Sequence, residues 1–170
     1  MSHQFQVNAS IDGISIHDFK RLAAVIELHE NVCQRIPGSQ IEILQSELQG
    51  STYTLKRSYN LDVNIPDIAK KLLKDAFRLQ RTDVSDLAQM TSVVELGANL
   101  PLQAHCERHV TGDEHSVHFH LNWTVKVKVP LIGGMLERHA EKEIRTFSLI
   151  EIDVVEDELR QALAAEAKRA

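Results

Sequence analysis

The feature that most constrains the fold is a strict alternation of apolar and polar residues over residues 115–129. The apolar positions are Val117, Phe119, Leu121, Trp123, Val125, Val127 and Val129. The positions between them carry histidine, asparagine, threonine and lysine. A two-residue period is typical of a β-strand that buries one face. Because strands usually have about 3–10 residues, one this long is expected to curve around another element before Pro130 ends it.

Weaker patterns of the same period predict the rest of a sheet. Strands are expected over residues 5–11, 40–48, 52–63, about 76–84, 88–96 and 101–110. The apolar residues of 40–48 change face midway, which predicts a β-bulge near Leu44. Gly112-Asp113 is expected to form a two-residue hairpin loop between strand 101–110 and the long strand that follows it.

Helical patterns flank these strands. Ser15-x-x-Asp18 has the form of a capping box, and helical spacing then runs to Ile36, where Pro37-Gly38 ends it. The spacing allows one helix or two short ones. A short helix is expected over about 65–75. From Leu131 almost to the end, two apolar stripes predict one long helix with a face wide enough to lie on a concave sheet.

Composition limits the functions to consider. The chain has 170 residues, which predicts a single domain over residues 1–170. Its net charge of −5 disfavours nucleic-acid binding, which needs clustered positive charge. Two distant cysteines suggest neither a disulfide framework nor a zinc site. We see no signal peptide and no membrane-spanning run, so we expect a cytoplasmic protein without membrane insertion.

The predicted order is strand, helical segment, a meander of about six strands and a long C-terminal helix, which is an α+β arrangement. In this layout the chain resembles the START-like helix-grip superfamily (SRPBCC), which includes polyketide cyclases, lipid-transfer domains and pollen-allergen-type proteins. The junction from Val127 to Glu137 (VKVPLIGGMLE) also resembles that of an uncharacterised bacterial branch, known as a domain of unknown function. The resemblance implies a helix-grip fold: a curved antiparallel sheet of about seven strands around the C-terminal helix, with short helical segments after strand 1. It also implies a hydrophobic cavity and a lipid, polyketide or sterol-like ligand, but no shared catalytic residues.

Three predicted strands interrupt an apolar, inward-facing pattern with an arginine: Arg57, Arg81 and Arg108. A buried guanidinium needs an acid, water or a ligand as partner. One interpretation is that these arginines hold an anionic head group while rings and aliphatic side chains surround the tail. The other is that they pair with Asp83, Glu95 or a helix carboxylate such as Glu143. The candidate ligand-binding residues are Tyr53, Arg57, Tyr59, Phe77, Arg81, Arg108, Phe119, Leu121, Trp123 and Phe147.

Histidines on the outer face of the predicted hairpin are candidate metal ligands. With a two-residue loop, Glu107 lies opposite His118 and His105 opposite His120, and such groups can bind zinc. Outward residues on a sheet are more often simply solvated, so we expect no metal and no other cofactor. No nucleophile elbow, P-loop or glycine-rich dinucleotide motif is present.

The leading hypothesis is a non-enzymatic protein that binds, and could transport, a hydrophobic or amphipathic small molecule such as a lipid or fatty acid. The cavity would lie between sheet and C-terminal helix. A second hypothesis is a cyclase- or hydrolase-type enzyme that uses the same cavity, with Tyr53, Tyr59, Arg57 or Glu95 as polar groups. A third is a protein-interaction module without a ligand. The sequence leaves the ligand and the oligomeric state undetermined.

Overall fold

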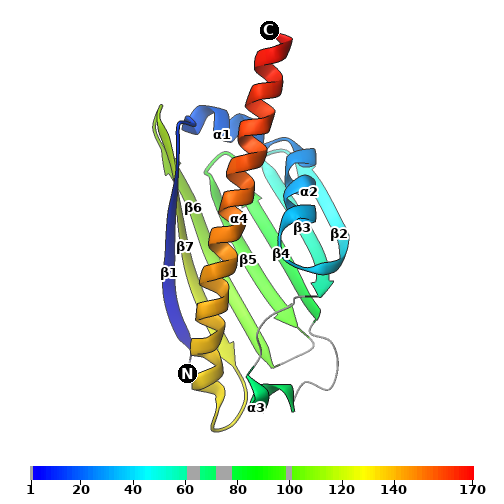
Figure 1. Ribbon diagram of the computed structural model, residues 1–170, viewed down its shortest axis with the longest axis vertical. Coiled ribbons are helices and arrows are strands. Elements are labelled where there is room, and N and C mark those ends of the chain that lie inside the picture. The colour runs from blue at the N-terminus through cyan, green and yellow to red at the C-terminus, as the bar shows by residue number, and fades with distance from the viewer. Residues whose placement is uncertain (1, 61–65, 72–77, 99–100) are drawn as a thin grey trace.

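A computed structural model describes residues 2–60, 66–71, 78–98 and 101–170. Within them the chain forms a seven-stranded antiparallel sheet and four helices (Figure 1). The elements are β1 (His3–Asp12), α1 (Ile16–Ala23), α2 (Ile26–Arg35), β2 (Ser39–Gln49), β3 (Thr52–Asn60), α3 (Asp67–Lys70), β4 (Arg78–Asp86), β5 (Thr91–Ala98), β6 (Leu102–Gly112), β7 (Ser116–Val127) and α4 (Gly133–Arg169). The strand order is β1-β7-β6-β5-β4-β3-β2, so the first strand pairs with the last.

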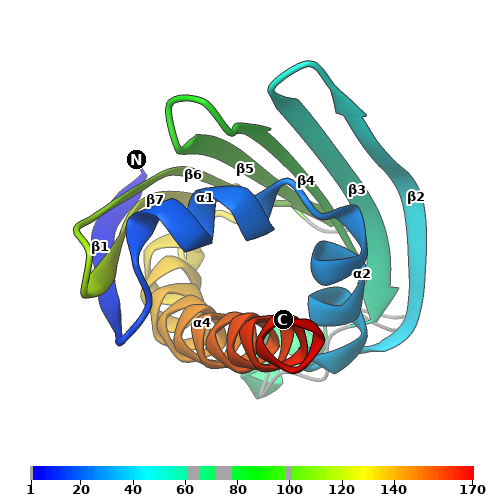
Figure 2. The ribbon, with the colours of Figure 1, turned by 90° about the horizontal axis from the view of Figure 1, so that it is seen from above.

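The sheet is strongly curved, and helices occupy its concave side. Seen from above, the strands form an arc, with α1 and α2 inside it and α4 across its open side (Figure 2). This confirms the predicted helix-grip fold: an α+β arrangement of seven antiparallel strands around a long C-terminal helix, with short helices after strand 1. Each strand therefore turns its apolar face toward the helices on the concave side.

Strand β7 has the alternation that the sequence predicts. Its apolar residues, from Val117 to Val127, are buried, whereas the residues between them are exposed or half-buried. Phe5 of β1 and Cys106 of β6 lie opposite Trp123 on either side. The core therefore lies between the middle of the sheet and the face of α4 that carries Ile152 and Leu159.

The predicted bulge is confirmed, and the predicted hairpin loop is wrong. Pairing between β2 and β3 shifts between Ile43 and Gln45, which leaves Leu44 as the extra residue. In the β6–β7 hairpin, Gly112 pairs with Val117, so four residues, 113–116, separate the paired ends instead of two. The Asp113 carboxylate accepts hydrogen bonds from the backbone N–H groups of loop residue 115 and of the first residue of β7, at 2.8 and 2.9 Å, and these bonds stabilise the longer loop.

The helices follow their sequence signals with some differences in length. Ser15 caps α1, because its hydroxyl accepts a hydrogen bond from the Asp18 N–H at 3.0 Å. The chain then breaks at Val25, which has extended backbone angles, so two short helices form instead of one. The helix expected over 65–75 is present as α3, and residues 61–65 and 72–77 lie outside the described part of the chain.

The start of α4 lies unusually close to the sheet. A Cβ atom on Gly133 would lie 2.7 Å from the Val127 carbonyl oxygen, so only glycine fits there without a shift. Glu137, one turn later, is buried and accepts a hydrogen bond from the Val127 N–H at 3.1 Å. These contacts fix the junction between β7 and α4.

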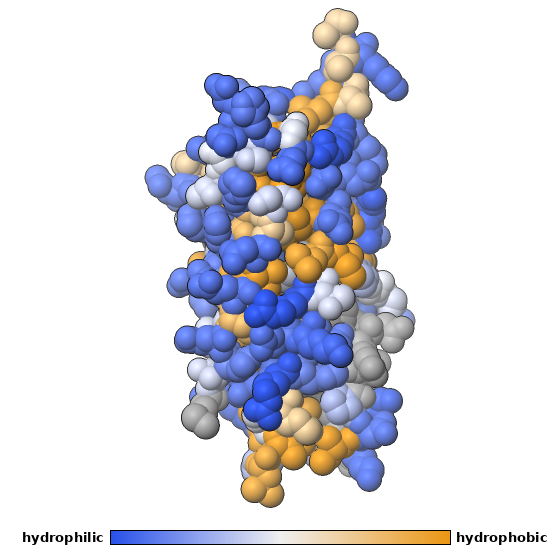
Figure 3. All heavy atoms as spheres, turned by 60° about the vertical axis from the view of Figure 1, so that its left-hand side comes forward, coloured by the Kyte–Doolittle hydropathy of each residue, from blue (hydrophilic) through white to orange (hydrophobic). Residues whose placement is uncertain are grey.

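On the face that includes β1 and α4, a band of hydrophobic residues lies between hydrophilic ones, and hydrophobic residues also gather at the end where α4 begins (Figure 3). Two exposed hydrophobic residues lie where α4 begins: Leu131, which is fully exposed, just before the helix, and Met135 in its first turn. No helix in the described residues is long and apolar enough to cross a membrane.

Candidate functional site

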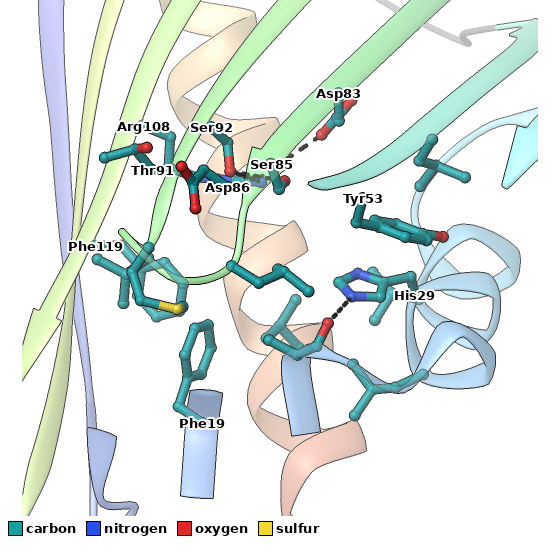
Figure 4. A pocket seen from close by; sticks show the side chains of 18 of the residues that line it. Phe19, His29, Tyr53, Asp83, Ser85, Asp86, Thr91, Ser92, Arg108 and Phe119 are labelled. Carbon is teal, nitrogen blue, oxygen red and sulfur yellow. Dashed lines mark hydrogen bonds and ion pairs between the residues drawn. The ribbon is translucent and has the colours of Figure 1, made fainter. Parts of the chain in front are cut away.

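A cavity of about 100 Å³ lies between α1, α2, the middle strands of the sheet and α4. Its apolar lining comes from Phe19, Ala23, Leu28, Val32, Leu55, Leu87, Met90, Val110, Phe119, Val155 and Leu159. Its polar lining comes from His29, Tyr53, Arg57, Asp83, Ser85, Asp86, Thr91, Ser92, Arg108 and Glu151. Figure 4 shows Arg108 and two serines along one side, the rings of Phe19 and Phe119 below them, and His29 with Tyr53 across the space. The cavity therefore has both apolar walls and a polar side.

Arg81 lies at the centre of a buried charge cluster beside this cavity. Its Nε and Nη2 donate to the two carboxylate oxygens of Asp83, each at 2.8 Å. Its Nη1 and Nη2 donate to both oxygens of Glu151 on α4, at 2.8 and 3.0 Å. Arg81 itself is 3% exposed, so these four charge-assisted bonds form away from solvent. They join the middle of the sheet to the long helix.

Arg57 is buried as deeply but is less well paired. It is 2% exposed, and its Nη1 donates to the Cys33 sulfur at 2.8 Å. Its closest carboxylate oxygen belongs to Glu151, at 3.7 Å from Nη2. Its Nε is buried with no hydrogen-bond partner among the described residues. Arg57 therefore has unused donor capacity next to the cavity.

Arg108 extends from β6 into the same region. Its Nη2 donates to the Ser92 hydroxyl at 3.1 Å, and Ser92 in turn lies 2.8 Å from the Ser85 hydroxyl. Its Nη1 is 3.9 Å from the nearer oxygen of Asp83, which is too far for a hydrogen bond. Like Arg57, it lacks a carboxylate of its own.

The two buried carboxylates are ionised. Burial alone would raise the pKa of Asp83, but the charge of Arg81, helped by Arg57 and Arg108, lowers it to about 2. Burial also opposes ionisation of Glu151, and Arg81 and Arg57 again lower its pKa. The cluster therefore contains three guanidinium groups and two carboxylates, and both carboxylates are engaged by Arg81.

His29 forms a second polar group on the cavity wall. Its Nε2 lies 2.7 Å from the carbonyl oxygen of Ala23, which can only accept, so Nε2 carries the proton. Burial lowers the pKa of His29, which makes the ring neutral at pH 7. The ring is stacked on Tyr53 at a centroid distance of 4.4 Å. Its Nδ1 is therefore a hydrogen-bond acceptor.

The structure brings four of the ten predicted site residues to this cavity: Tyr53, Arg57, Arg108 and Phe119. Arg81 lies behind them in its ion pairs. Tyr59, Leu121 and Trp123 are buried, Phe147 is half-buried, and none of the four lines this cavity. Phe77 lies outside the described residues. Their roles as ligand contacts remain predictions.

Other cavity residues escaped sequence reasoning. Phe19 and His29 belong to α1 and α2, for which the sequence pattern predicted helices but no part in a site. Met90 ends the turn before β5. Glu151 is the helix partner of the arginines, whereas Glu143 lies near His139 and Glu95 pairs with His105 on the outer face. A carboxylate between the two apolar stripes of the long helix was the one available signal for Glu151.

The outer-face histidines do not come together as predicted. With the longer loop, Glu107 lies opposite Asn122 and His105 opposite Thr124. His109 faces His120 instead, with ring centroids 5.2 Å apart. Among the described residues, no group of three or more histidine, cysteine, aspartate or glutamate side chains is placed to hold a metal ion.

Comparisons with solved structures place the fold among known ones. The aromatase/cyclase Zhui from Streptomyces sp. R1128 is similar over 95% of this chain and 96% of its own, with a TM-score of 0.62 and 14% identity. Norcoclaurine synthase from Thalictrum flavum, in complex with dopamine and hydroxybenzaldehyde, is similar over 94% and 88%, with a TM-score of 0.61 and 13% identity. A START superfamily protein from Mycobacterium smegmatis is similar over 92% and 98%, with a TM-score of 0.54 and 12% identity.

At these identities the similarities show a common fold. They confirm the START-like resemblance that the order of elements suggested. The comparison with curated proteins found no match. A family model, described as "Protein of unknown function (DUF2505)", matches residues 9–159.

Proposed function

Because the chain belongs to the DUF2505 family of proteins of unknown function, we propose a function from the site itself. The protein binds a hydrophobic or amphipathic small molecule, with lipids and fatty acids among the candidates, in the cavity between sheet and α4. The observation that carries this proposal is a largely apolar cavity with two incompletely paired arginines on its wall. Pockets of this composition, apolar with a few placed polar groups, are typical of small-molecule sites.

The structural neighbours support the same choice. Norcoclaurine synthase is in complex with dopamine and hydroxybenzaldehyde, two small aromatic molecules, and the Streptomyces protein is an aromatase/cyclase. The fold is therefore one in which another protein binds small aromatic molecules. Fold similarity alone is a weak argument for function, so the cavity residues carry the proposal.

The test is native mass spectrometry of the purified protein, followed by solvent extraction and identification of any released molecule. We expect a bound compound, or stabilisation of the protein by members of a panel of fatty acids and apolar alcohols. Val155→Phe places a ring in the cavity from α4 and should abolish binding. Ile150→Phe adds the same ring to an exposed position of the same helix and should not. A ligand-free mass together with no stabilisation by any panel member would refute the proposal.

A second candidate, an enzyme that uses acid–base chemistry in the same cavity, is favoured by His29. A neutral imidazole with a fixed tautomer and an available Nδ1 is suited to accept a proton from a bound compound. Turnover of the molecule released from the protein, lost in His29→Phe while binding remains, would establish an enzyme. Binding without turnover would leave a carrier or sensor.

A further inference from the structure

The three inward arginines differ in how their charges are matched. Arg81 donates hydrogen bonds to all four carboxylate oxygens of Asp83 and Glu151. The other two guanidinium groups face the same two carboxylates only from 3.7 and 3.9 Å. The carboxylates therefore hydrogen-bond to the arginine that does not line the cavity, and the two arginines that do line it have only the longer ion-pair contacts to them.

Arg57 and Arg108 form their side-chain hydrogen bonds with neutral groups instead of with a carboxylate. Arg57 donates to a thiol sulfur and keeps a buried Nε without a partner, and Arg108 donates to one serine hydroxyl. A guanidinium group binds best to a planar anion that accepts two parallel hydrogen bonds. The polar side of the cavity therefore lacks an acceptor that a bound carboxylate would supply.

One further carboxylate lines the cavity, and it has another role. The Asp86 Oδ1 accepts hydrogen bonds from the backbone N–H groups of Ala88 and Gln89, each at 3.0 Å, and so caps the turn between β4 and β5. No ion pair joins Asp86 to either cavity arginine among the described residues. Ionised Asp83 and Glu151 accept their hydrogen bonds from Arg81, and His29 is neutral, so none of these titratable groups forms a hydrogen-bonded ion pair with Arg57 or Arg108.

The volume limits the size of the bound molecule. The cavity is about 100 Å³, whereas an engineered apolar cavity that holds one benzene molecule is about 150 Å³. The cavity is partly open, so a single ring with a small substituent can fit by reaching into the opening, whereas a long alkyl chain exceeds the enclosed volume. The rings of Phe19 and Phe119, which meet edge to face at 5.5 Å, and the His29–Tyr53 stack provide flat aromatic walls.

We propose that this cavity selects a compact apolar carboxylic acid. The carboxylate accepts hydrogen bonds from Arg108 and Arg57, and the apolar body, of about one ring, lies against Phe19 and Phe119. This inference rests on the proposed function and narrows it from amphipathic molecules in general to small monoacids. It makes Arg108 and Arg57 specificity-determining residues and assigns Arg81 to the support of the fold.

The test compares benzoate with benzamide, which has nearly the same size and shape but no charge. Binding is measured by NMR titration of the ¹⁵N-labelled full chain at pH 7 and low salt. We expect benzoate to bind the wild-type protein about ten- to a hundredfold more tightly than benzamide, as hydrogen bonds to a charged partner predict. Arg108→Gln should reduce this ratio to about one.

Arg78→Gln is the matched control. Arg78 lies on β4 like Arg81 but is partly exposed, and it donates to the Gln40 carbonyl and to Asn60 away from the cavity. This variant should keep the wild-type ratio. Arg108→Lys retains the charge without the planar fork, so an intermediate ratio is expected, and it provides the readout if Arg108→Gln does not fold.

Equal affinities for the two probes, or a preference that survives in Arg108→Gln, would overturn the inference. Failure of both probes to bind would also overturn it. The two proposals can be told apart. If the native protein releases a neutral or long-chain compound, small-molecule binding stands and only the preference for compact acids is refuted.

Discussion

Glu151 connects the longest helix to the sheet, and its replacement by glutamine is the sharpest test of the charge cluster. The change removes the negative charge that two hydrogen bonds to Arg81 and one longer contact to Arg57 share. Removing one partner of a buried ion pair costs about 3–5 kcal/mol, because a charge is left buried without compensation. Glutamine keeps one carbonyl acceptor and Arg81 keeps Asp83, so we expect the lower end, about 3 kcal/mol.

That loss is large for a chain of this size. Domains have free energies of unfolding of about 5–15 kcal/mol, so about 3 kcal/mol is a substantial fraction. It corresponds to a fall in Tm of about 6–12 °C, at about 2–4 °C per kcal/mol. Urea unfolding followed by the fluorescence of Trp123, the single and buried tryptophan, measures it directly. The midpoint should fall while the slope with urea stays unchanged.

Glu156→Gln is the matched control on the same helix. Glu156 accepts from Arg160 at 3.1 Å, one turn away, and both side chains are substantially exposed. Such a pair contributes about 0.3–0.5 kcal/mol. If Glu151→Gln destabilises the protein no more than Glu156→Gln does, the claim that the cluster holds α4 to the sheet is wrong.

Three further predictions concern stability and reactivity. The pKa of Asp83 is about 2 in the folded protein against an ordinary 3.8, so ionised Asp83 stabilises the fold above pH 4 and this stabilisation is lost as the pH falls toward 2. The free energy of unfolding, measured as a function of pH, should fall by about 2 kcal/mol in that window, and the fall should be absent in Asp83→Asn. Gly112→Ala should cost about 1–3 kcal/mol in urea unfolding, because its Cβ would lie 2.4 Å from a backbone oxygen of β7, whereas Gly97→Ala, with nothing within 4 Å, should cost much less. Ellman's reagent should label neither Cys33 nor Cys106 in the native protein and both after unfolding, because both thiols are buried and burial raises their pKa values, that of Cys106 to about 12; rapid native labelling would contradict this.

Sequence reasoning succeeded where the signal is local and repetitive. The alternation of β7 and the change of face at Leu44 both follow from the two-residue period of a strand, and both are confirmed. The β6–β7 loop was mispredicted because the glycine at 112 suggested the tightest turn, while the hydrogen bonds to Asp113 stabilise a longer loop over 113–116. The centre of the loop lies two residues further along the chain than predicted, and this moves each cross-strand partner by four residues.

The charge cluster shows why a site is harder to predict than a fold. That Arg81 pairs with Asp83 follows from two positions on one face of one strand. That Glu151 also binds Arg81 depends on which turn of α4 lies over this part of the sheet, and the sequence pattern does not specify this turn. The cavity role of His29 likewise depends on the angle between α1 and α2.

The strand order has a consequence for how the chain is made. Among the described strands β1 pairs with β7 alone, and His3 lies opposite Val125, so β1 emerges from the ribosome more than a hundred residues before its partner exists. Until then its apolar residues Phe5, Val7 and Ile11 have no sheet to join. Contacts this distant in sequence slow folding and leave the apolar residues of β1 exposed to aggregation during synthesis. The addition of β1 to the sheet therefore has to wait until β7 has been made, and the packing of α4 against the sheet has to wait until α4 has followed it.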